Sequence, residues 1–417
     1  MEYGCIGEKL SHSFSKIIHN KLCDYDYEIK EVPRDELKQF MQTADFKAIN
    51  VTIPYKQDVI PFMDEISDIA KKIGAVNTIV KKDGKLYGFN TDFSGMTDLI
   101  LKNNISLKNK KVLILGSGGT SKTALAVAES MGAGEIHRVS RTAKEGLITY
   151  ADAEKHHSDA EIIINTTPCG MYPRMGESAV DISKFPSLSG VVDAVYNPLR
   201  SQLVVDAMER GIPATGGLYM LVAQAVYAVE KFLSVTIPKS ETDRVYNEIM
   251  TAKKNLVLIG MPGCGKTTLG KILANELNKK FLDIDEEIVR QTGFTIPEIF
   301  AAKGEEGFRQ IESEVIARIS VEQGLVIATG GGAVLRKRNV ELLRQNGMIV
   351  FIDRSLEKLV TTNDRPLSSN RELLEKRYNE RYEIYCRAAN FKIDADYGIQ
   401  ENIKAIKEVF LNENTCN

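Results

Sequence analysis

The chain has 417 residues, a formal net charge of −2 and 43% hydrophobic residues. This length exceeds one typical domain, so we expect two or three compact units with buried cores. The near-neutral net charge argues against nucleic acid as a partner. The sequence has no run of about 18 apolar residues, so we do not expect a membrane-spanning helix. Six scattered cysteines without a CxxC pair, and a start without a signal-peptide pattern, indicate a cytoplasmic protein with reduced thiols. The five histidines are also dispersed, so we expect no metal-binding histidine cluster.

Strand-like and helix-like segments alternate along the chain, which indicates an α/β fold. The first expected domain is residues 1–87, completed by residues 215–240, which contain a strongly apolar helix. Residues 88–214 have the pattern of a Rossmann-like domain. The strands expected in these two domains lie at 48–53, 75–80, 111–116, 135–140, 161–167 and 190–196.

A polar stretch with Pro, Ser and Thr at residues 234–243 marks a soft boundary. Residues 241–254, partly helical in pattern, are expected to link two halves. The α/β pattern restarts with a buried strand, and residues 255–417 are predicted to form a P-loop domain with a parallel sheet, of the nucleotide-kinase type.

Residues 112–125, VLILGSGGTSKTAL, place Gly116, Gly118 and Gly119 between an apolar strand and an Ala-rich helix. Glycines here allow a tight turn and a close backbone approach to a pyrophosphate at the helix N-terminus. Ser121 replaces the third small residue of the usual pattern, and a glycine turn without a ligand is the alternative.

The end of the next strand reads VSRTAK, where NAD-binding proteins usually carry an Asp or Glu. Arg141 is suited to a 2′-phosphate, with Ser140 and Thr142 as hydroxyl donors. This predicts NADP(H) in preference to NAD. A solvated arginine after a strand is the alternative.

Five motifs lie in order along residues 1–240. They are GEKLSHSFSKIIHN (7–20), NVTIPYK (50–56), GAVNT (74–78), GFNTDFSG (88–95) and GGLYMLVAQA (216–225). This half resembles shikimate dehydrogenase. The resemblance implies Lys56 and Asp92 as the catalytic pair, Gly217 as a cofactor contact, and a set of shikimate-binding residues, namely Ser13, Ser15, Thr52, Asn77 and Gln224. Lys16 stands where the family usually has proline.

The residue chemistry agrees with this implication. An ammonium such as Lys56 stabilises the alkoxide that develops when a ketone is reduced, and it delivers the proton. Asp92 is able to hold the lysine and bond a substrate hydroxyl. The alternative, when each residue is considered alone, is that Lys56 is a surface lysine and that Asp92 is a helix N-cap.

The segment GMPGCGKT (260–267) fits the Walker A pattern between a strand and a helix. Its backbone N–H groups are suited to bind phosphates. Lys266 is suited to contact the β- and γ-phosphates, and Thr267 is suited to bind a Mg²⁺ ion. The sequence therefore predicts ATP binding by Gly260, Gly263, Gly265, Lys266, Thr267 and Thr268.

Further motifs follow the loop: FLDIDEEI (281–288), KGEEGFRQIE (303–312), VIATGGGAV (326–334), DRPL (364–367) and RYNERYEIY (377–385). This half resembles shikimate kinase. The resemblance implies Asp283 as a Mg²⁺ contact, Asp285 as the residue that positions the attacked hydroxyl, and Arg365 as a lid residue. It implies a substrate carboxylate site of Arg309, Gly331, Gly332 and Arg381. A surface ion pair is the alternative for Arg309 and Glu312.

The lid departs from the family because EKLVTTNDRPLSSN (357–370) is short and lacks an arginine before the DRPL motif. Lys358 is the nearest cation. We expect looser closure over ATP or a slower kinase.

The two resemblances are to consecutive steps of one route, which predicts a bifunctional enzyme. NADPH would reduce 3-dehydroshikimate to shikimate, and MgATP would phosphorylate shikimate to shikimate 3-phosphate. The alternative is a quinate/shikimate dehydrogenase fused to a weak or degenerate kinase-like binding module.

Overall fold

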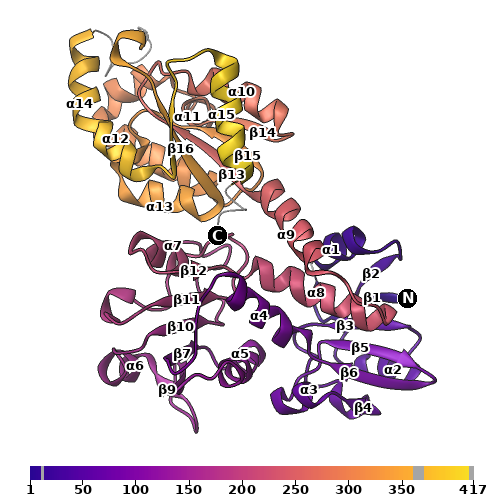
Figure 1. Cartoon of the computed structure of the whole chain (residues 1–417). Coiled ribbons are helices and arrows are strands. Elements are labelled where there is room, and N and C mark those ends of the chain that lie inside the picture. Colours follow the sequence, from indigo (N-terminus) through magenta and orange to yellow (C-terminus); the bar gives the residue numbers. More distant parts are fainter. Residues whose placement is uncertain (11–13, 360–370, 413–417) are drawn as a thin grey trace. The chain divides into compact units, whose positions relative to one another are not determined.

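The computed structural model describes residues 1–10, 14–359 and 371–412 (Figure 1). Two compact units make up the chain. The first comprises Met1–Met171, Glu177–Asn197 and Asp206–Glu248, and the second comprises Tyr172–Gly176, Pro198–Val205 and Ile249–Asn417. Strands and helices alternate in both, which confirms the predicted α/β class. In the described ranges, no helix is both long and apolar enough to cross a membrane.

The N-terminal part of the first unit is a mixed sheet with helices. In chain order it contains β1 (Tyr3–Gly7), α1 (Ser15–Leu22), β2 (Tyr27–Glu31), α2 (Leu37–Thr43), β3 (Ala48–Val51), η1 (Ile60–Phe62), β4 (Glu65–Ile66), α3 (Asp68–Ile73), β5 (Thr78–Lys82), β6 (Lys85–Phe89) and α4 (Thr91–Lys102). The strand order is β2-β1-β3-β5-β6-β4. β1 pairs in parallel with β2 and β3, whereas β5 runs antiparallel to β3 and β6.

The rest of the first unit is built on a parallel sheet. Its elements, together with the helix that leads out of it, are β7 (Lys111–Leu115), α5 (Gly119–Ser130), β8 (Glu135–Ser140), β9 (Ile148–Thr149), α6 (Tyr150–His156), β10 (Ile162–Asn165), η2 (Ile182–Lys184), β11 (Gly190–Asp193), α7 (Gln202–Glu209), β12 (Ala214–Thr215), α8 (Leu218–Leu233) and α9 (Lys239–Lys253). The order is β12-β11-β10-β7-β8-β9. Each predicted strand overlaps an observed one, and 135–140 coincides with β8.

Helix α9 begins at Lys239, inside the stretch that the sequence assigned to a polar boundary. Arg244 forms ion pairs of 2.8 Å with both Glu241 and Glu248, one turn before and after it. Such pairs stabilise a polar helix by about 0.2–0.5 kcal/mol each. Residues 241–253 are therefore helical throughout, and their role as a linker stays a prediction.

The second unit contains another parallel sheet. Its elements are β13 (Asn255–Ile259), α10 (Lys266–Glu276), β14 (Lys280–Asp283), α11 (Ile284–Thr292), α12 (Ile296–Ile319), β15 (Leu325–Ala328), η3 (Ala333–Leu335), α13 (Lys337–Asn346), β16 (Gly347–Asp353), η4 (Leu356–Lys358), α14 (Arg371–Ala388), β17 (Phe391–Asp394) and α15 (Ile399–Asn412). The strand order is β14-β15-β13-β16-β17. β13 is buried along its whole length, as its apolar sequence predicts.

Helices α4 and α8 lie side by side in the first unit (Figure 1). Toward its start, α8 places Tyr219 and Ala223 in the core of the parallel sheet. Nearer its end, Phe232 packs with Tyr27 of the mixed sheet. A methyl group on Gly95 of α4 would lie 2.7 Å from the backbone oxygen of Met220 in α8. The contact between these helices therefore requires a glycine.

This close approach predicts the effect of Gly95→Ala. The added methyl group meets backbone, which cannot turn aside, so we expect a loss of about 1–3 kcal/mol in the free energy of unfolding. Urea unfolding of the full chain measures it. Ser94→Ala on the same helix is the control, and equal stability of the two variants would contradict the packing argument.

Candidate active sites

The first candidate site contains an ion pair between Lys56 and Asp92. Lys56 Nζ donates to Asp92 Oδ2 at 2.5 Å, and the side chains are 22% and 13% exposed. Partial burial strengthens such a pair relative to one in water. Asn90 caps α4 by accepting from the Phe93 N–H at 3.3 Å, so the N-cap alternative for Asp92 is wrong. Lys56 is not a fully exposed surface lysine either.

Asn77 ties this ion pair to the loop before β5. Its Oδ1 accepts from the Thr91 N–H at 2.8 Å, and its Nδ2 donates to Thr91 Oγ1 at 3.1 Å. The next residue along α4 is Asp92. Backbone Val76 N–H also donates to the Lys56 carbonyl at 2.7 Å. Three predicted site residues are therefore held in one hydrogen-bonded arrangement.

The other predicted substrate residues lie on the elements around this pair. Thr52 follows β3, and its N–H donates to the Ile6 carbonyl at 3.0 Å. Gln224 lies on α8 against Gly95 of α4, and its Nε2 donates to the Leu221 carbonyl at 2.9 Å. Ser15 begins α1 and is partly buried. Ser13 lies outside the described residues.

The glycine turn after β7 has the backbone form that the sequence predicts. Gly116 has φ +117°, and a methyl group there would lie 2.6 Å from Thr166 Oγ1. Gly118 is the N-cap of α5 without a capping side chain, and Gly119 begins the helix. Added methyl groups at both would meet open space. The free N–H groups at this helix start are an anion-binding arrangement.

The predicted 2′-phosphate residues follow the neighbouring strand. β8 pairs in parallel with β7, so Arg141 leaves the sheet at the same edge as the glycine turn. Arg141 and Thr142 are exposed. Ser140 is buried, and its hydroxyl donates to the Thr142 carbonyl, so it is used within the turn.

Gly217 lies at the start of α8, close to the end of β11. Its N–H donates to the Val195 carbonyl at 2.8 Å. A methyl group there would lie 2.3 Å from the Ala194 oxygen. Close packing against Ala194 therefore explains why position 217 is a glycine, and the cofactor contact of Gly217 stays a prediction.

The Walker A loop of the second unit joins β13 to α10. Gly260, Gly263 and Gly265 have φ of +143°, +79° and +99°, a backbone form that favours glycine. Lys266 is buried, and its Nζ donates to the carbonyls of Gly260 and Met261 at 2.9 Å each. The ammonium is therefore held over the loop that would carry phosphates.

Thr267 and Asp283 meet beside this loop. Thr267 Oγ1 donates to Asp283 Oδ2 at 2.8 Å, while Asp283 Oδ1 accepts the Asp285 N–H at 3.0 Å and caps α11. A hydroxyl and a carboxylate oxygen in contact are a donor set that fits Mg²⁺. Thr268 is exposed in the first turn of α10.

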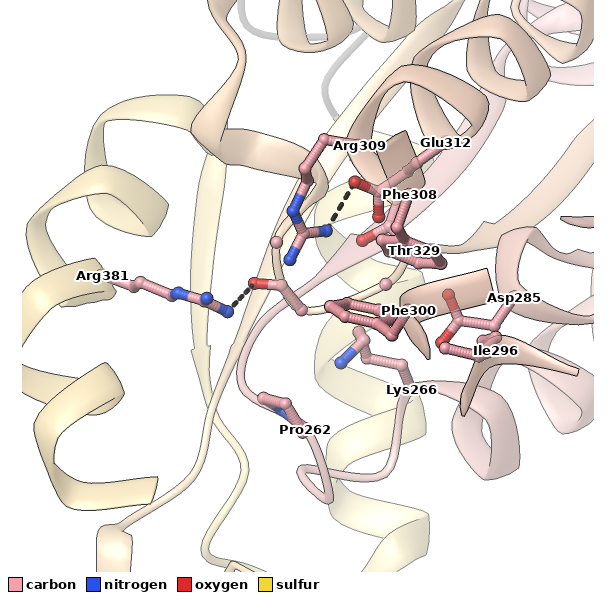
Figure 2. Close-up of a pocket in the computed structure, with 13 residues that line it drawn as sticks. Pro262, Lys266, Asp285, Ile296, Phe300, Phe308, Arg309, Glu312, Thr329 and Arg381 are labelled. Atoms are coloured by element: carbon pink, nitrogen blue, oxygen red, sulfur yellow. Dashed lines mark hydrogen bonds and ion pairs between the residues drawn. The ribbon is translucent and has the colours of Figure 1, made fainter. Parts of the chain in front are cut away.

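A pocket opens next to the loop (Figure 2). Its lining residues are Pro262, Lys266, Asp285, Ile296, Phe300, Phe308, Arg309, Glu312, Thr329, Gly330, Gly331, Gly332 and Arg381. Apolar and aromatic side chains thus face a group of charged ones. Such a lining suits a small ligand with a carbon ring and several polar groups.

Two arginines approach the glycine-rich loop after β15. Arg309 Nη1 donates to Glu312 Oε2 at 2.6 Å, and both side chains are buried, so the surface-pair alternative is wrong. Arg381 Nη1 donates to the Gly331 carbonyl at 3.1 Å (Figure 2). A methyl group on Gly332 would lie 2.2 Å from Arg309 Nη2.

Burial shifts the ionisation of this pocket. It raises the pKa of Glu312, against the lowering effect of Arg309, and it lowers the pKa of Arg381. Lys266, Arg309 and Arg381 are the cationic lining residues, whereas Asp285 and Glu312 are the carboxylates. One more carboxylate, from a ligand, would balance the charge.

Two predicted features lie at or beyond the edge of the described structure. Arg365 and the lid segment 360–370 are outside the described residues. Lys358, the nearest cation before the DRPL motif, donates to the Asp396 carbonyl at 2.9 Å and lies 3.7 Å from Asp396 Oδ2. Lys358 is therefore already bound to the end of the sheet.

Family comparisons match both units. The model of the shikimate dehydrogenase substrate binding domain matches residues 5–79. The shikimate dehydrogenase (NADP(+)) of Clostridium beijerinckii is 36% identical over 262 residues, covering 59% of this chain and 96% of that protein. The chain belongs to the shikimate dehydrogenase family. The shikimate kinase model matches residues 262–410, so a shikimate kinase domain is fused to the dehydrogenase.

Solved structures resemble the dehydrogenase half. The chorismate mutase/shikimate 5-dehydrogenase fusion protein from Clostridium acetobutylicum has a TM-score of 0.57 and 36% identity, covering 59% of this chain and 96% of that one. The Thermus thermophilus shikimate 5-dehydrogenase in complex with NADP(H) and shikimate has a TM-score of 0.54 and 25% identity, with coverage of 60% and 99%. A quinate dehydrogenase from Corynebacterium glutamicum in complex with NAD has a TM-score of 0.53 and 25% identity, with coverage of 60% of this chain and 99% of that one.

The dehydrogenase half also contains a buried hydrogen-bond network next to Asn77 that was not predicted from the sequence. The Tyr27 hydroxyl donates to Asn50 Oδ1 at 2.7 Å. Asn50 Nδ2 in turn lies 3.3 Å from the Asn77 carbonyl and 3.2 Å from Thr78 Oγ1. All four residues are buried. The available signal was a polar residue, Asn50, inside the apolar strand β3.

This hydrogen-bond network predicts the effect of Tyr27→Phe in the shikimate dehydrogenase half. The change leaves the buried Asn50 oxygen without its donor, which costs about 1–3 kcal/mol in unfolding free energy. It also loosens Asn77, so we expect a higher KM for shikimate. Tyr3→Phe is the control because the Tyr3 ring stacks on Tyr25 and no hydrogen bond of its hydroxyl occurs within the described structure. Identical KM and stability in both variants would contradict the prediction.

Proposed function

We propose that the chain catalyses two successive reactions. The dehydrogenase half reduces 3-dehydroshikimate to shikimate with NADPH, and the kinase half phosphorylates the 3-hydroxyl of shikimate with MgATP. The observation that carries the proposal is the pocket beside the Walker A loop. It combines the lysine of a phosphate site with two arginines suited to a carboxylate, in a chain whose other half belongs to the shikimate dehydrogenase family.

For the reduction, bound NADPH would supply the hydride that the ketone needs. Lys56 donates a proton from Nζ to the oxygen that becomes an alkoxide. Asp92, 2.5 Å from that nitrogen, holds the ammonium in position. Asn77 fixes the start of α4 and so the direction of Asp92. Ser13, Ser15, Thr52 and Gln224 are proposed to bond the ring hydroxyls and carboxylate.

NADP(H) is favoured over NAD by the exposed Arg141 at the carboxyl edge of β8. A guanidinium there binds a 2′-phosphate, whereas an Asp or Glu at that place would repel it. The names of the curated relatives, which include NADP(+), support the same choice. A quinate dehydrogenase with NAD has the same fold, so quinate and NAD are the competing substrates to measure.

For the phosphorylation, Asp285 is proposed to bond the attacked hydroxyl and orient it toward the γ-phosphate. Arg309 and Arg381, with the N–H groups of Gly331 and Gly332, are proposed to hold the carboxylate. Lys266 neutralises charge on the phosphates. Arg365 is proposed to do so from the lid.

Mg²⁺ would be held by Thr267 and, through water, by Asp283. When bound, Mg²⁺ would supply positive charge that neutralises the phosphates. The 2.8 Å hydrogen bond between these two residues supports the proposal, because it places a hydroxyl and a carboxylate oxygen side by side next to the Walker A loop.

The competing possibility is a kinase half that binds ligands without turnover. The Lys266, Asp285, Arg309 and Arg381 side chains all line one pocket, which favours an active kinase. The short lid and the engagement of Lys358 with Asp396 favour a slower one.

Reciprocal variants of the full chain test the two activities. Lys56→Met removes the proton donor, so we expect about a 10²–10⁴-fold loss of 3-dehydroshikimate reduction. Lys266→Met removes a phosphate contact, so we expect about a 10²–10³-fold loss of shikimate-dependent ADP release. Each variant is the folding control for the other, because each should retain the activity it does not target. A wild-type chain without shikimate-dependent ADP release, yet able to bind ATP and shikimate by calorimetry, would support the binding-module alternative.

Cofactor choice is tested by Arg141→Ala. A charge-assisted hydrogen bond is worth about 1.5–3 kcal/mol, so KM for NADPH should rise about 10- to 100-fold while KM for NADH stays nearly constant. Lys155→Ala, an exposed lysine on α6, is the matched charge control. Parallel rates with quinate and shikimate decide substrate preference. An unchanged KM for NADPH would contradict the role given to Arg141.

A further inference from the structure

Away from both candidate active sites, the parallel sheet of the first unit gathers two histidines and a glutamate. Glu135 and His137 lie two residues apart on β8, so their side chains leave the same face. His157 is the C-cap of α6. One ligand atom from each of the three lies within 4.8 Å of the others. The fold therefore brings together two histidines that are dispersed in the sequence, and whether they bind a metal stays a prediction.

The three ligand atoms lie close together, although their spacing is not yet that of a metal site. His137 Nε2 lies 2.5 Å from Glu135 Oε1, and His157 Nδ1 lies 3.9 Å from the same oxygen. The ligands of a tetrahedral Zn²⁺ are about 3.4 Å apart, because each bond is about 2.0–2.2 Å long. The present spacings lie on either side of that value. Metal binding would therefore open the hydrogen bond between His137 and Glu135 and draw His157 closer to both.

His157 has an unused ligand atom in this cluster. Its Nδ1 is buried and has no hydrogen-bond partner among the residues that the structure describes. Burial first, and then the neighbouring His137 and Lys111, lower the pKa of His157. The unpartnered Nδ1 is the geometric reason to count His157 as a ligand.

The surrounding charges permit a cation. Lys111 Nζ lies 3.4 Å from Glu135 Oε1, but it is closer to Asp159 Oδ1, at 2.9 Å. Glu135 is therefore able to turn toward an ion while Lys111 keeps its other carboxylate partner. Two carboxylates and one ammonium leave the cluster with a net negative charge.

We propose that Glu135, His137 and His157 bind a divalent transition-metal ion, for which Zn²⁺ is the best fit. Two imidazoles and a carboxylate are ligands that Zn²⁺ accepts, with water in the fourth position. Mg²⁺ is a poor fit because it demands an octahedral set of oxygens.

The place of the cluster indicates what the ion does. Glu135 begins β8, and His157 precedes β10, so the cluster lies at the amino edge of the parallel sheet. Gly116 and Arg141 follow the carboxyl ends of β7 and β8, at the opposite edge. The ion braces β8 against the segment between α6 and β10, and it takes no part in hydride transfer.

The test uses the full chain, stripped of metal and kept reduced with a phosphine. Calorimetric titration with Zn²⁺ should show one more bound ion in the wild type than in His157→Gln or His137→Gln. Co²⁺ should give a visible absorption band in the wild type that both variants lack. His156→Gln, an exposed neighbour of His157, is the control and should keep the band. Dehydrogenase rates should be equal in all four proteins.

Zn²⁺ stoichiometry and a Co²⁺ spectrum unchanged in both His157→Gln and His137→Gln would overturn the proposal. So would loss of the band in His156→Gln to the same degree. Thermal unfolding in the presence of a chelator checks that the variants fold. Because His137 is more exposed than His157, His137→Gln keeps the test decisive if His157→Gln is unstable.

Discussion

The constraint on which both halves depend is the common direction of parallel strands. In each unit, the strands deliver their carboxyl ends to one edge of a sheet, and the residues proposed for nucleotide binding follow those ends. Gly116 follows β7 and Arg141 follows β8. The Walker A loop follows β13, and Thr329 follows β15. Residues far apart in the sequence therefore converge without any special loop design.

Features encoded by adjacent residues were predictable from sequence. The strand–glycine–helix segments at Gly116 and Gly260 and the strand β8 carry their signals locally, in apolar runs and glycine spacing. The fusion was predictable because each half has several motifs in a fixed order. The features that could not be predicted depend on how deeply a residue is buried and on contacts between different helices and strands. The i, i+3 spacing of Arg309 and Glu312 is the same on a surface and in a core, and only the fold showed that the pair is buried.

Contacts between distant segments were missed for the same reason. Tyr27 and Asn50 belong to β2 and the end of β3, and nothing local in either strand predicts their hydrogen bond. His137 and His157 lie on different elements, so their spacing in sequence fits no metal motif. The start of α9 lies inside the expected polar boundary at 234–243, and the helix combines ion pairs around Arg244 with a buried Val245 and a Tyr246 that packs on the core.

The three glycines after β15 have a consequence for how this pocket tolerates change. None of them has the positive φ that would require glycine, yet a methyl group on each would collide with a different neighbour. Gly330 faces the carboxylates of Glu312 and Asp285, Gly331 faces the Pro262 ring, and Gly332 faces the Arg309 guanidinium. Glycine is thus required at these three positions because neighbouring atoms leave no room for a side chain, and not because the backbone has to bend. A larger residue at any one position would be acceptable only with a smaller partner opposite it, and that partner differs for each glycine.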